Sequence, residues 1–553
     1  MITIHELSPL VVAKIAAGEV IERPSYAIKE LIENAIDAQA TEIKIHIEEA
    51  GLAKLQVIDN GIGMSEEDVM ECWKPHTTSK LESEYDLHTI RSFGFRGEAL
   101  SSLGAISKIT IQSRQQASPT GFSVSIRNGT LDRSSVVGMS MGTIVTAENL
   151  FEKIPARKKF LKSSQTELRY CIGMVEQFAM SYPDIQFTLT HGKKTVLTFP
   201  PAKERIDRIA QILGDITCSF LIPFKKEKSY IAIEGYIAKP QMHSSTQSKQ
   251  YLFLNGRAVS DKSVAMAVKE AYGTMLESNT YPLFVLYISL PYDMVDINVH
   301  PRKEQVSFTD ARFLFQTVKD MIAEVLGEHN LVYENLSWKK TGAGLANSFA
   351  GNLLKESVLN AEKYAVEHPS FIQQFHRLYI IVTTKHSLHI YDQHAAHERI
   401  LFEKLKNEFL ILKGEKKSIV LSTPIRLICT KREQLTLNEH IGEFEKLGFT
   451  FKGDNITHIP LLFKDRNPND FIQRMLEDLE VTHKPKAVDT MSEEMLAFLA
   501  CRAAVKAGDL LSEVQMKTIV QELETTPNKS TCPHGRPTQV AMHVHELNSL
   551  FKR

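Results

Sequence analysis

The sequence predicts a multidomain protein of mixed α and β structure. Its 553 residues exceed what one hydrophobic core ordinarily organises, so about three domains are expected. Hydrophobic residues make up 43% of the chain and charged residues 24%, which is ordinary for a soluble globular protein. Segments with the apolar spacing of a helix alternate with segments in which every second residue is apolar. Together these observations favour α+β domains, with helices on one face of a sheet.

The first 150 residues alternate helices and strands. Residues 24–38 predict a helix, because apolar residues such as Ile28, Leu31 and Ile32 lie on one side of it. Residues 42–48 predict a strand, because Ile43, Ile45 and Ile47 alternate with polar residues. Further strands are predicted at 55–58, 108–114 and 122–127.

Residues 151–330 predict a second α/β unit, which begins with a helix near 163–181 and closes with one at 310–326. From residue 333 to 368 the composition changes to glycine, asparagine, serine and alanine, so this stretch is the best linker candidate. A third mixed domain follows from Phe371 to Arg553. Strands of the second unit are predicted at 185–190, 230–237, 251–254 and 284–290.

Charge and cysteine content narrow the function classes. The formal net charge is −1, so any contact with nucleic acid must come from local clusters of lysine and arginine. The chain has no apolar run of about eighteen residues, and its N-terminus is unlike a signal peptide, so no membrane segment is predicted. Six scattered cysteines favour a cytoplasmic location and reduced thiols, which are then free to pack or to bind metal.

The polar side of the first predicted helix has two interpretations. Glu30, Glu33, Asn34 and Asp37 lie opposite the apolar residues. A solvated polar face is the ordinary interpretation of such a helix. An asparagine among carboxylates also suits Mg²⁺, with a glutamate placed to polarise a water molecule. Spacing alone does not choose between them.

Glycine-rich segments at 59–63, 94–98 and 142–143 are candidates for phosphate or nucleotide contact, because glycine lets backbone N–H groups approach a phosphate closely. Each of them is also an ordinary turn sequence. A GxxxxGK[ST] sequence is absent, so a Walker-type ATP site is not indicated.

A segment rich in carboxylates and imidazoles begins at Asp392, directly after a predicted strand at 388–391. His394 and Glu398 are four residues apart, so a helix that begins here projects both from one face. With Cys532 and His534 on a distant Pro/Gly-rich loop, these groups suit a divalent transition metal. The ordinary interpretation is a surface helix capped by Asp392. A zinc-protease site is excluded, because HExxH and HxxEH are absent.

The order of these motifs resembles the GHKL ATPase fold, the superfamily of DNA gyrase, the large heat-shock chaperones and the MutL mismatch-repair proteins. The motifs lie at 29–38, 59–64, 76–80 and 94–100, and segments 15–20 and 296–303 resemble the MutL family specifically. The resemblance implies a GHKL α/β sandwich over 1–205, a ribosomal-S5-like domain over 206–332, a linker over 333–368, and a mixed α/β C-terminal dimerisation and endonuclease domain over 369–553.

For the ATP site, the resemblance implies that Glu30 is the general base and that Asn34 holds Mg²⁺. Asp59 would accept a hydrogen bond from the adenine amino group, with Gly63 giving the base room and Thr143 supporting that contact. Lys303 would reach the γ-phosphate from the second domain. The remaining ATP-binding candidates are Thr78 and Lys80, and the lid residues Gly94, Phe95, Arg96 and Gly97.

For the third domain, segments 392–403, 500–507 and 532–537 resemble the three motifs of the nicking MutL proteins. The resemblance implies a Zn²⁺ or Mn²⁺ site that cleaves a DNA phosphodiester, with Asp392 and Glu398 as its catalytic residues. Glu403 and Arg536 would orient ligands, and His397 is left as a surface or ligand-supporting residue. The implied ligands of one or two ions are Asp392, His394, Glu398, Cys532 and His534, with Cys501 nearby.

Partners follow from the resemblance and from local charge. It implies a homodimer that works with double-stranded DNA, a MutS-type mismatch recognition protein and a helicase. Docking on the replication sliding clamp stays open, because residues 418–424 lack the glutamine that leads the clamp-binding peptide. Basic clusters are usually solvated surface, yet two are candidates for DNA phosphate contacts. Their residues are Arg157, Lys158 and Lys159 in one, and Arg257 and Lys269 in the other.

The function expected from all of this is DNA mismatch repair by an ATP-driven clamp with a metal-dependent nicking site. One alternative is a matchmaker that only recruits other repair enzymes and whose metal motif is structural. The other is a chaperone-like GHKL ATPase that acts on protein clients, against which the motifs of the third domain count.

Overall fold

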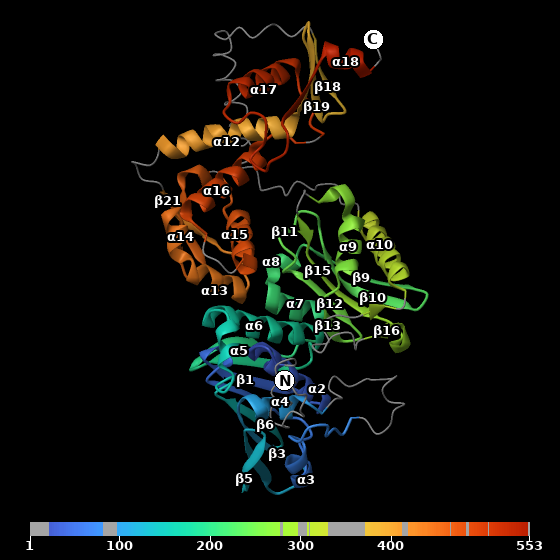
Figure 1. Ribbon diagram of the computed structural model, residues 1–553, viewed down its shortest axis with the longest axis vertical. Helices are drawn as coiled ribbons and strands as arrows, with labels where there is room; N and C mark the ends of the chain where they lie inside the picture. Colours follow the sequence, from blue (N-terminus) through green and yellow to red (C-terminus); the bar gives the residue numbers. More distant parts are fainter. Residues whose placement is uncertain are drawn as a thin grey trace, which may run out of the picture. The chain divides into compact units, whose positions relative to one another are not determined.

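The computed structural model describes residues 21–80, 97–276, 280–296, 307–308, 310–329, 371–411, 418–464, 466–482, 486–506 and 508–550. These residues form two compact units (Figure 1). The first unit joins residues 1–332 to two short segments, 428–439 and 476–483. The second unit takes in 333–427, 440–475 and 484–553. The predicted linker lies outside the described residues.

An eight-stranded sheet organises the N-terminal part of the first unit. Its strands are β1 Glu42–Glu48, β2 Lys54–Asp59, β3 Lys108–Arg114, β4 Gly121–Arg127, β5 Thr130–Val137, β6 Gly142–Glu148, β7 Gln186–His191 and β8 Lys194–Phe199. They lie in the order β5-β4-β3-β6-β2-β1-β7-β8, antiparallel except for the parallel pair β1 and β7. Ile43, Ile45 and Ile47 of β1 are buried, as their alternation predicts.

Helices α2 and α6 pack on this sheet and on each other. Helix α2 begins at Pro24, a residue whose missing N–H costs nothing at a helix start, and buries Ile28, Leu31 and Ile32. The helices of this part are α2 Pro24–Asp37, α3 Glu66–Glu71, α4 Ala99–Ile106, α5 Pro155–Phe160, α6 Ser164–Ser181, α7 Arg205–Leu213 and α8 Asp215–Cys218.

A five-stranded sheet follows in the same unit. Its strands are β9 Leu221–Lys228, β10 Ile231–Ala238, β12 Gln250–Leu254, β13 Arg257–Val259 and β15 Phe284–Ser289, with helices α9 Lys262–Tyr272 and α10 Ala311–Glu328 packed beside it (Figure 1). Their order is β13-β12-β15-β10-β9, so β15 is central and its run Phe284–Ile288 is buried throughout. Two short pairs complete this part: β11 His243–Ser244 with β14 Tyr281–Pro282, and β16 Val295–Asp296 with β17 Ser307–Phe308.

The second unit contains two antiparallel sheets. The first runs in the order β18-β19-β20-β24 and the second in the order β21-β23-β22, from strands β18 Phe371–Phe375, β19 Tyr379–Thr383, β20 Ser387–Asp392, β21 Ser418–Arg426, β22 Thr450–Lys452, β23 Asn455–Pro460 and β24 Gln539–His543. Helix α12 follows β20 directly, and α16 and α17 pack against it. The helices from residue 393 onward are α12 Gln393–Ile411, α13 Lys431–Glu439, α14 Ile441–Lys446, α15 Asn469–Thr482, α16 Val488–Ala503, α17 Glu513–Thr525 and α18 Val544–Leu550, of which α13 belongs to the first unit.

The predicted elements agree closely with these bounds. The strands expected at 42–48 and 108–114 are β1 and β3, and the helix expected at 24–38 is α2, one residue shorter. The helix expected to begin after Asp392 is α12. The predicted mixed α/β architecture is confirmed.

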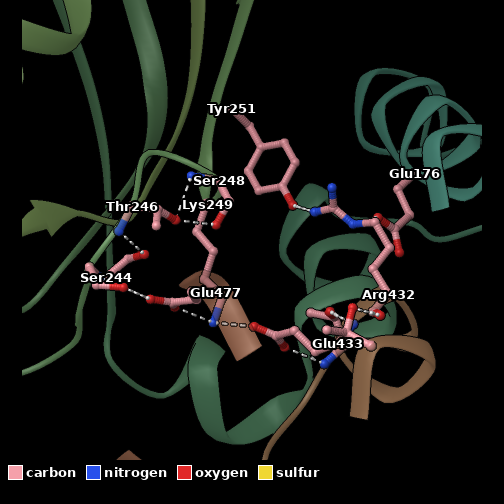
Figure 2. Close-up of polar contacts among 12 residues, drawn as sticks. Glu176, Ser244, Thr246, Ser248, Lys249, Tyr251, Arg432, Glu433 and Glu477 are labelled. Atoms are coloured by element: carbon pink, nitrogen blue, oxygen red, sulfur yellow. Dashed lines mark hydrogen bonds and ion pairs between the residues drawn. The ribbon is translucent and has the colours of Figure 1, made fainter. Parts of the chain in front are cut away.

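A buried network of charged side chains joins distant segments of the first unit (Figure 2). The ammonium of Lys249 lies 2.8 Å from a carboxylate oxygen of Glu433 on α13 and 3.0 Å from one of Glu477. The side chains of Glu433 and Glu477 are only 2% and 5% exposed. Burial alone lowers the pKa of Lys249, but the two carboxylates raise it above its ordinary range, so the lysine stays charged.

A second pair adjoins this network. The Nε of Arg432 lies 3.0 Å from a carboxylate oxygen of Glu176, and its terminal nitrogen donates to the Tyr251 hydroxyl over 3.0 Å. Burial raises the pKa of Glu176 to about 7, although the guanidinium opposes that shift. The network therefore compensates buried charges that would each be costly alone.

Replacing Lys249 with methionine is expected to destabilise the first unit by about 3 kcal/mol, because it leaves two buried carboxylates without a counter-charge. Urea unfolding followed by circular dichroism measures this as a lower midpoint. Lys226→Met is the matched control, since Lys226 pairs with Glu324 and Glu328 at the surface and its loss should change little. Equal midpoints for the two variants would contradict the expectation.

Candidate functional site

The polar side of α2 is not a solvated face. Lys29 and Glu33 are 8% and 3% exposed, and their side chains pair over 3.0 Å. Glu30 lies 3.6 Å from the same ammonium and keeps 13% of its side chain exposed. The interpretation of this side as ordinary solvated surface is therefore wrong. Glu30 thus lies beside a buried lysine and is still accessible to water.

The oxygen predicted to hold Mg²⁺ already faces a cation. The ammonium of Lys80 donates to Oδ1 of Asn34 over 3.0 Å and also pairs with Asp37. This contact brings one predicted ATP-binding residue onto the predicted metal ligand. The hydroxyl of Thr78 accepts from the Lys80 backbone N–H over 3.2 Å, which fixes the chain just before the lysine side chain.

Asp59 ends β2 directly opposite Thr143 at the start of β6. Its carboxylate accepts from the Gly61 N–H over 2.9 Å. Burial raises the pKa of Asp59 to about 6, partly offset by hydrogen bonds from the backbone of Gly61 and Thr143. A half-buried acceptor at the ends of two paired strands suits an amino group of a purine base.

Two glycines of the predicted site are required by close backbone approach. Gly63 has φ +71°, and a Cβ there would lie 2.1 Å from the carbonyl oxygen of Arg114. Gly97 has φ +62°, and a Cβ there would lie 2.5 Å from the carbonyl oxygen of Thr77. The predicted lid residues Gly94, Phe95 and Arg96, and Lys303 of the second domain, lie outside the described residues.

In the second unit, Asp392 starts the predicted metal segment as a helix cap. Its Oδ1 accepts from the backbone N–H groups of His394 and Ala395 over 3.0 and 2.9 Å. It therefore fulfils the capping role that the sequence allows. The cap sets α12 in place, so that His394 and Glu398 project from the same side one turn apart.

The structure brings the two distant segments together around Glu398. One group of possible ligands is His394, Glu398 and Cys501, and the other is Glu398, Cys532 and His534. Within each group the ligand atoms lie within 4.8 Å of one another. Asp392 belongs to neither group. The shared carboxylate makes two neighbouring metal positions the arrangement that this geometry fits.

A tight turn presents the two ligands of the C-terminal loop. The Cys532 N–H donates to the Arg536 carbonyl over 2.8 Å, and the Gly535 N–H donates to the Cys532 carbonyl over 3.0 Å. The turn is held to α12 by Arg399, whose Nε donates to the Thr531 carbonyl over 2.6 Å. Glu403 in turn pairs with Arg399 over 3.0 Å, so its predicted orienting role acts through this arginine.

The charges of the site are matched by contacts across it. Burial alone raises the pKa of Glu398, but the His534 imidazole at 2.9 Å, with hydrogen bonds from Cys532 and Cys501, lowers it to about 2. Hydrogen bonds with Cys532 and Glu398 raise the pKa of His534 to about 9. A proton on His534 thus compensates the buried carboxylate, which is 2% exposed.

The donor set fits a divalent transition metal. Thiolate, imidazole and carboxylate are the ligands of zinc sites, and bonds of about 2.0–2.3 Å to one ion bring ligand atoms to within about 4 Å of each other. Cys532 is buried at 1% exposure, while His534 keeps the site open to solvent on one side.

The two basic clusters differ in solvent exposure. Lys158 and Lys159 are exposed on α5, whereas Arg257 is 8% exposed. The phosphate contacts of both clusters stay predictions. The ammonium of Lys269 lies 4.2 Å from the centre of the Tyr281 ring.

Within the described ranges, every helix is too short or too polar to span a lipid bilayer.

One supporting residue, Gln393, was not predicted from the sequence, and for a second, His397, the sequence left two interpretations open. Gln393 is completely buried and donates to the Lys506 carbonyl over 2.8 Å. His397, left as a surface or supporting residue, is 6% exposed and accepts from the Val505 N–H over 3.1 Å. Burial, then the charges of Lys404 and His394, lower the pKa of His397 to about 4, so it is neutral. Their partners are backbone groups 108 to 113 residues away, which no sequence pattern indicates.

Three family models match the chain. The model described as histidine kinase-, DNA gyrase B- and HSP90-like ATPase matches residues 22–139, over α2 and the first strands. The model described as DNA mismatch repair protein, C-terminal domain, matches 209–327. The model described as MutL C terminal dimerisation domain matches 372–511.

Curated relatives match from end to end. The DNA mismatch repair protein MutL of Geotalea daltonii is 32% identical over 98% of each chain. That of Coxiella burnetii is 33% identical over 100% of each chain. A crystal structure of the N terminal domain of a DNA repair protein is 24% identical with a TM-score of 0.51, covers 58% of this chain and 99% of its own, and supports the fold alone.

Proposed function

This chain belongs to the MutL family of DNA mismatch repair proteins, and we propose that it acts there as an ATP-driven clamp with its own metal-dependent nicking site. The observation that carries the nicking proposal is the convergence of Glu398 with Cys532 and His534, which are more than a hundred residues away in sequence. The proposed domains are an ATPase over 1–205, an S5-like domain over 206–332, a linker over 333–368 and the dimerisation and endonuclease domain over 369–553.

In the ATPase step, Glu30 takes the proton of the attacking water. Its position one turn before Asn34 on α2 supports this role, because a base and a Mg²⁺ ligand on one helix face meet the same phosphate. Asp59 accepts a hydrogen bond from the adenine amino group. Asn34 would hold Mg²⁺ through the side-chain oxygen that Lys80 contacts, and the Lys80 ammonium would then be free to pair with the phosphates.

For the nicking step, His394, Glu398 and Cys501 would hold one divalent ion, and Glu398, Cys532 and His534 would hold a second one. A bound Zn²⁺ or Mn²⁺ supplies Lewis-acid activation of water and of the phosphodiester. The protein supplies orientation: Asp392 caps α12, and Arg399 fixes the loop that carries Cys532. His534, exposed at the open side, releases its proton when it becomes a ligand.

The proposal extends to partners of the family. The matched dimerisation domain supports a homodimer, and the exposed Lys158 and Lys159 support contact with double-stranded DNA. A MutS-type recognition protein and a helicase belong to the same proposal, in the cytoplasm. Residues 418–424 form part of β21, and without the leading glutamine we leave the sliding clamp out of it.

Glu30→Gln is expected to bind ATP with unchanged affinity but to hydrolyse it about a hundredfold more slowly, because the amide cannot accept the proton of water. Equilibrium binding of a fluorescent ATP analogue and release of phosphate measure the two properties. Glu67→Gln, an exposed glutamate on α3 of the same domain, is the matched control and should hydrolyse ATP normally. Normal hydrolysis by the Glu30 variant would remove that residue from its proposed role.

Wild-type protein with Mn²⁺ is expected to nick supercoiled plasmid, and Glu398→Gln is expected to lose this activity, because it removes the carboxylate common to both ligand groups. Gel electrophoresis of relaxed circles measures the rate. Asp392→Asn is an informative companion, since asparagine also caps helices and its loss of nicking would indicate a role beyond the cap.

Glu30→Gln serves as the control for both variants and should still nick in the absence of ATP. If the wild-type protein and all three variants leave the plasmid intact, the nicking proposal fails, and the matchmaker remains as the function of the clamp.

A further inference from the structure

Two imidazoles of α12 hold the main chain of one residue, Val505. Nδ1 of His394 lies 2.8 Å from the Val505 carbonyl oxygen, and the Val505 N–H donates to Nδ1 of His397 over 3.1 Å. Val505 follows the C-cap of α16, four residues after Cys501. The residue bound by both imidazoles is therefore close in sequence to the thiol of one possible ligand group and hydrogen-bonded to the imidazole of the same group.

The contact with Val505 fixes the tautomer of His394. A carbonyl oxygen can only accept, so the proton of the His394 ring must sit on Nδ1. Nε2 then carries the free lone pair, which is the form in which an imidazole binds a metal ion. The Val505 carbonyl thus fixes the tautomer and the ring orientation of His394, as a carboxylate or carbonyl commonly does for a metal-binding histidine.

The imidazole of His397 fixes the position of the Val505 carbonyl that accepts from His394. A backbone N–H can only donate, so Nδ1 of His397 is an acceptor and that ring is neutral with its proton on Nε2. His397 is buried, and one turn of α12 separates it from His394. With its N–H and its carbonyl both bound to α12, Val505 has little freedom to rotate. The loop after α16 is further held by Gln393, which donates to the Lys506 carbonyl.

We infer that His397 is a positioning residue for the metal centre: by accepting the Val505 N–H it holds the Val505 carbonyl against Nδ1 of His394 and keeps Nε2 turned to the ion. This role rests on the proposed metal centre and adds a residue to it. The same clamp ties the end of α16, and with it Cys501, to α12. His397 itself supplies no ligand atom to either group.

The test compares His397→Asn with His397→Leu in the full-length chain. The Asn Oδ1 occupies the place of the imidazole Nδ1 and can accept the Val505 N–H, whereas leucine has nearly the same shape and cannot. Both variants lose the same ring volume, so a difference between them reports the hydrogen bond alone. Co²⁺ serves as the probe, because its thiolate and ligand-field absorption bands report binding without any assay of nicking.

The asparagine variant is expected to bind Co²⁺ like the wild-type chain, and the leucine variant about 10–100-fold more weakly. ATP hydrolysis, which belongs to the other unit, should be the same in all three proteins, and equal circular dichroism spectra check that the second unit is folded in each of them. Equal Co²⁺ affinities in leucine variant and wild type, or an equal loss in both variants, would overturn the positioning role. If the leucine variant does not accumulate, the asparagine variant decides, since weakened Co²⁺ binding there contradicts the inference.

Failure of the metal centre itself looks different. A wild-type chain that shows no thiolate-to-cobalt absorption lacks the centre, and both the nicking proposal and the role of His397 then fall together. A wild-type chain that binds Co²⁺ while all variants bind equally well retains the centre and loses only the positioning role.

Discussion

The buried carboxylate of Glu398 is the constraint on which the second unit depends. A charge that is 2% exposed is tolerated only with partners, and here they come from three separate parts of the chain. His534 and Cys532 arrive on the C-terminal turn, Cys501 at the end of α16, and His394 from the same helix. Each of these segments is in turn held by a hydrogen bond from α12: the turn by Arg399, and the end of α16 by the two imidazoles on Val505.

In the ATPase half, helix α2 likewise carries buried charged side chains that need partners. Lys29 and Glu33 are both nearly inaccessible and pair with each other, and Glu30 lies partly open beside them. Farther along the same helix side, Lys80 pairs with Asp37 and donates to Asn34. In both halves one helix thus carries acidic candidate site residues that already have cationic partners. The glycines at 63 and 97 add the second requirement, close approach of one backbone to another.

Most of the fold could be predicted from the sequence because its elements are locally consistent. The isoleucines of β1 alternate, and α2 has proline at its start and one apolar side, so their bounds follow from spacing. The site could be predicted from spacing only where its residues lie on one helix. His394 and Glu398 share a helix face, but nothing in their spacing brings Cys532 to them; the family resemblance supplied that pairing.

What the sequence could not indicate depends on long-range burial or on backbone partners. Arg257 looks like any basic surface residue in the sequence, yet it begins β13 and is only 8% exposed. Lys249 and Glu433 are ordinary charged residues until packing makes them mutual counter-ions. Asp392 suits a cap and a ligand equally by composition, and only coordinates reveal which hydrogen bonds its oxygen makes.

The ammonium that rests on the Asn34 oxygen has one further consequence. Lys80 pairs with Asp37 and donates to Asn34, so a divalent ion bound at the Asn34 oxygen would have to displace the lysine ammonium from it. An ammonium on a flexible four-carbon side chain suits contact with phosphate oxygens once it is released. The chain just before the lysine is itself held in place, because Thr77 packs so closely against Gly97 that a Cβ there would lie 2.5 Å from the Thr77 carbonyl oxygen.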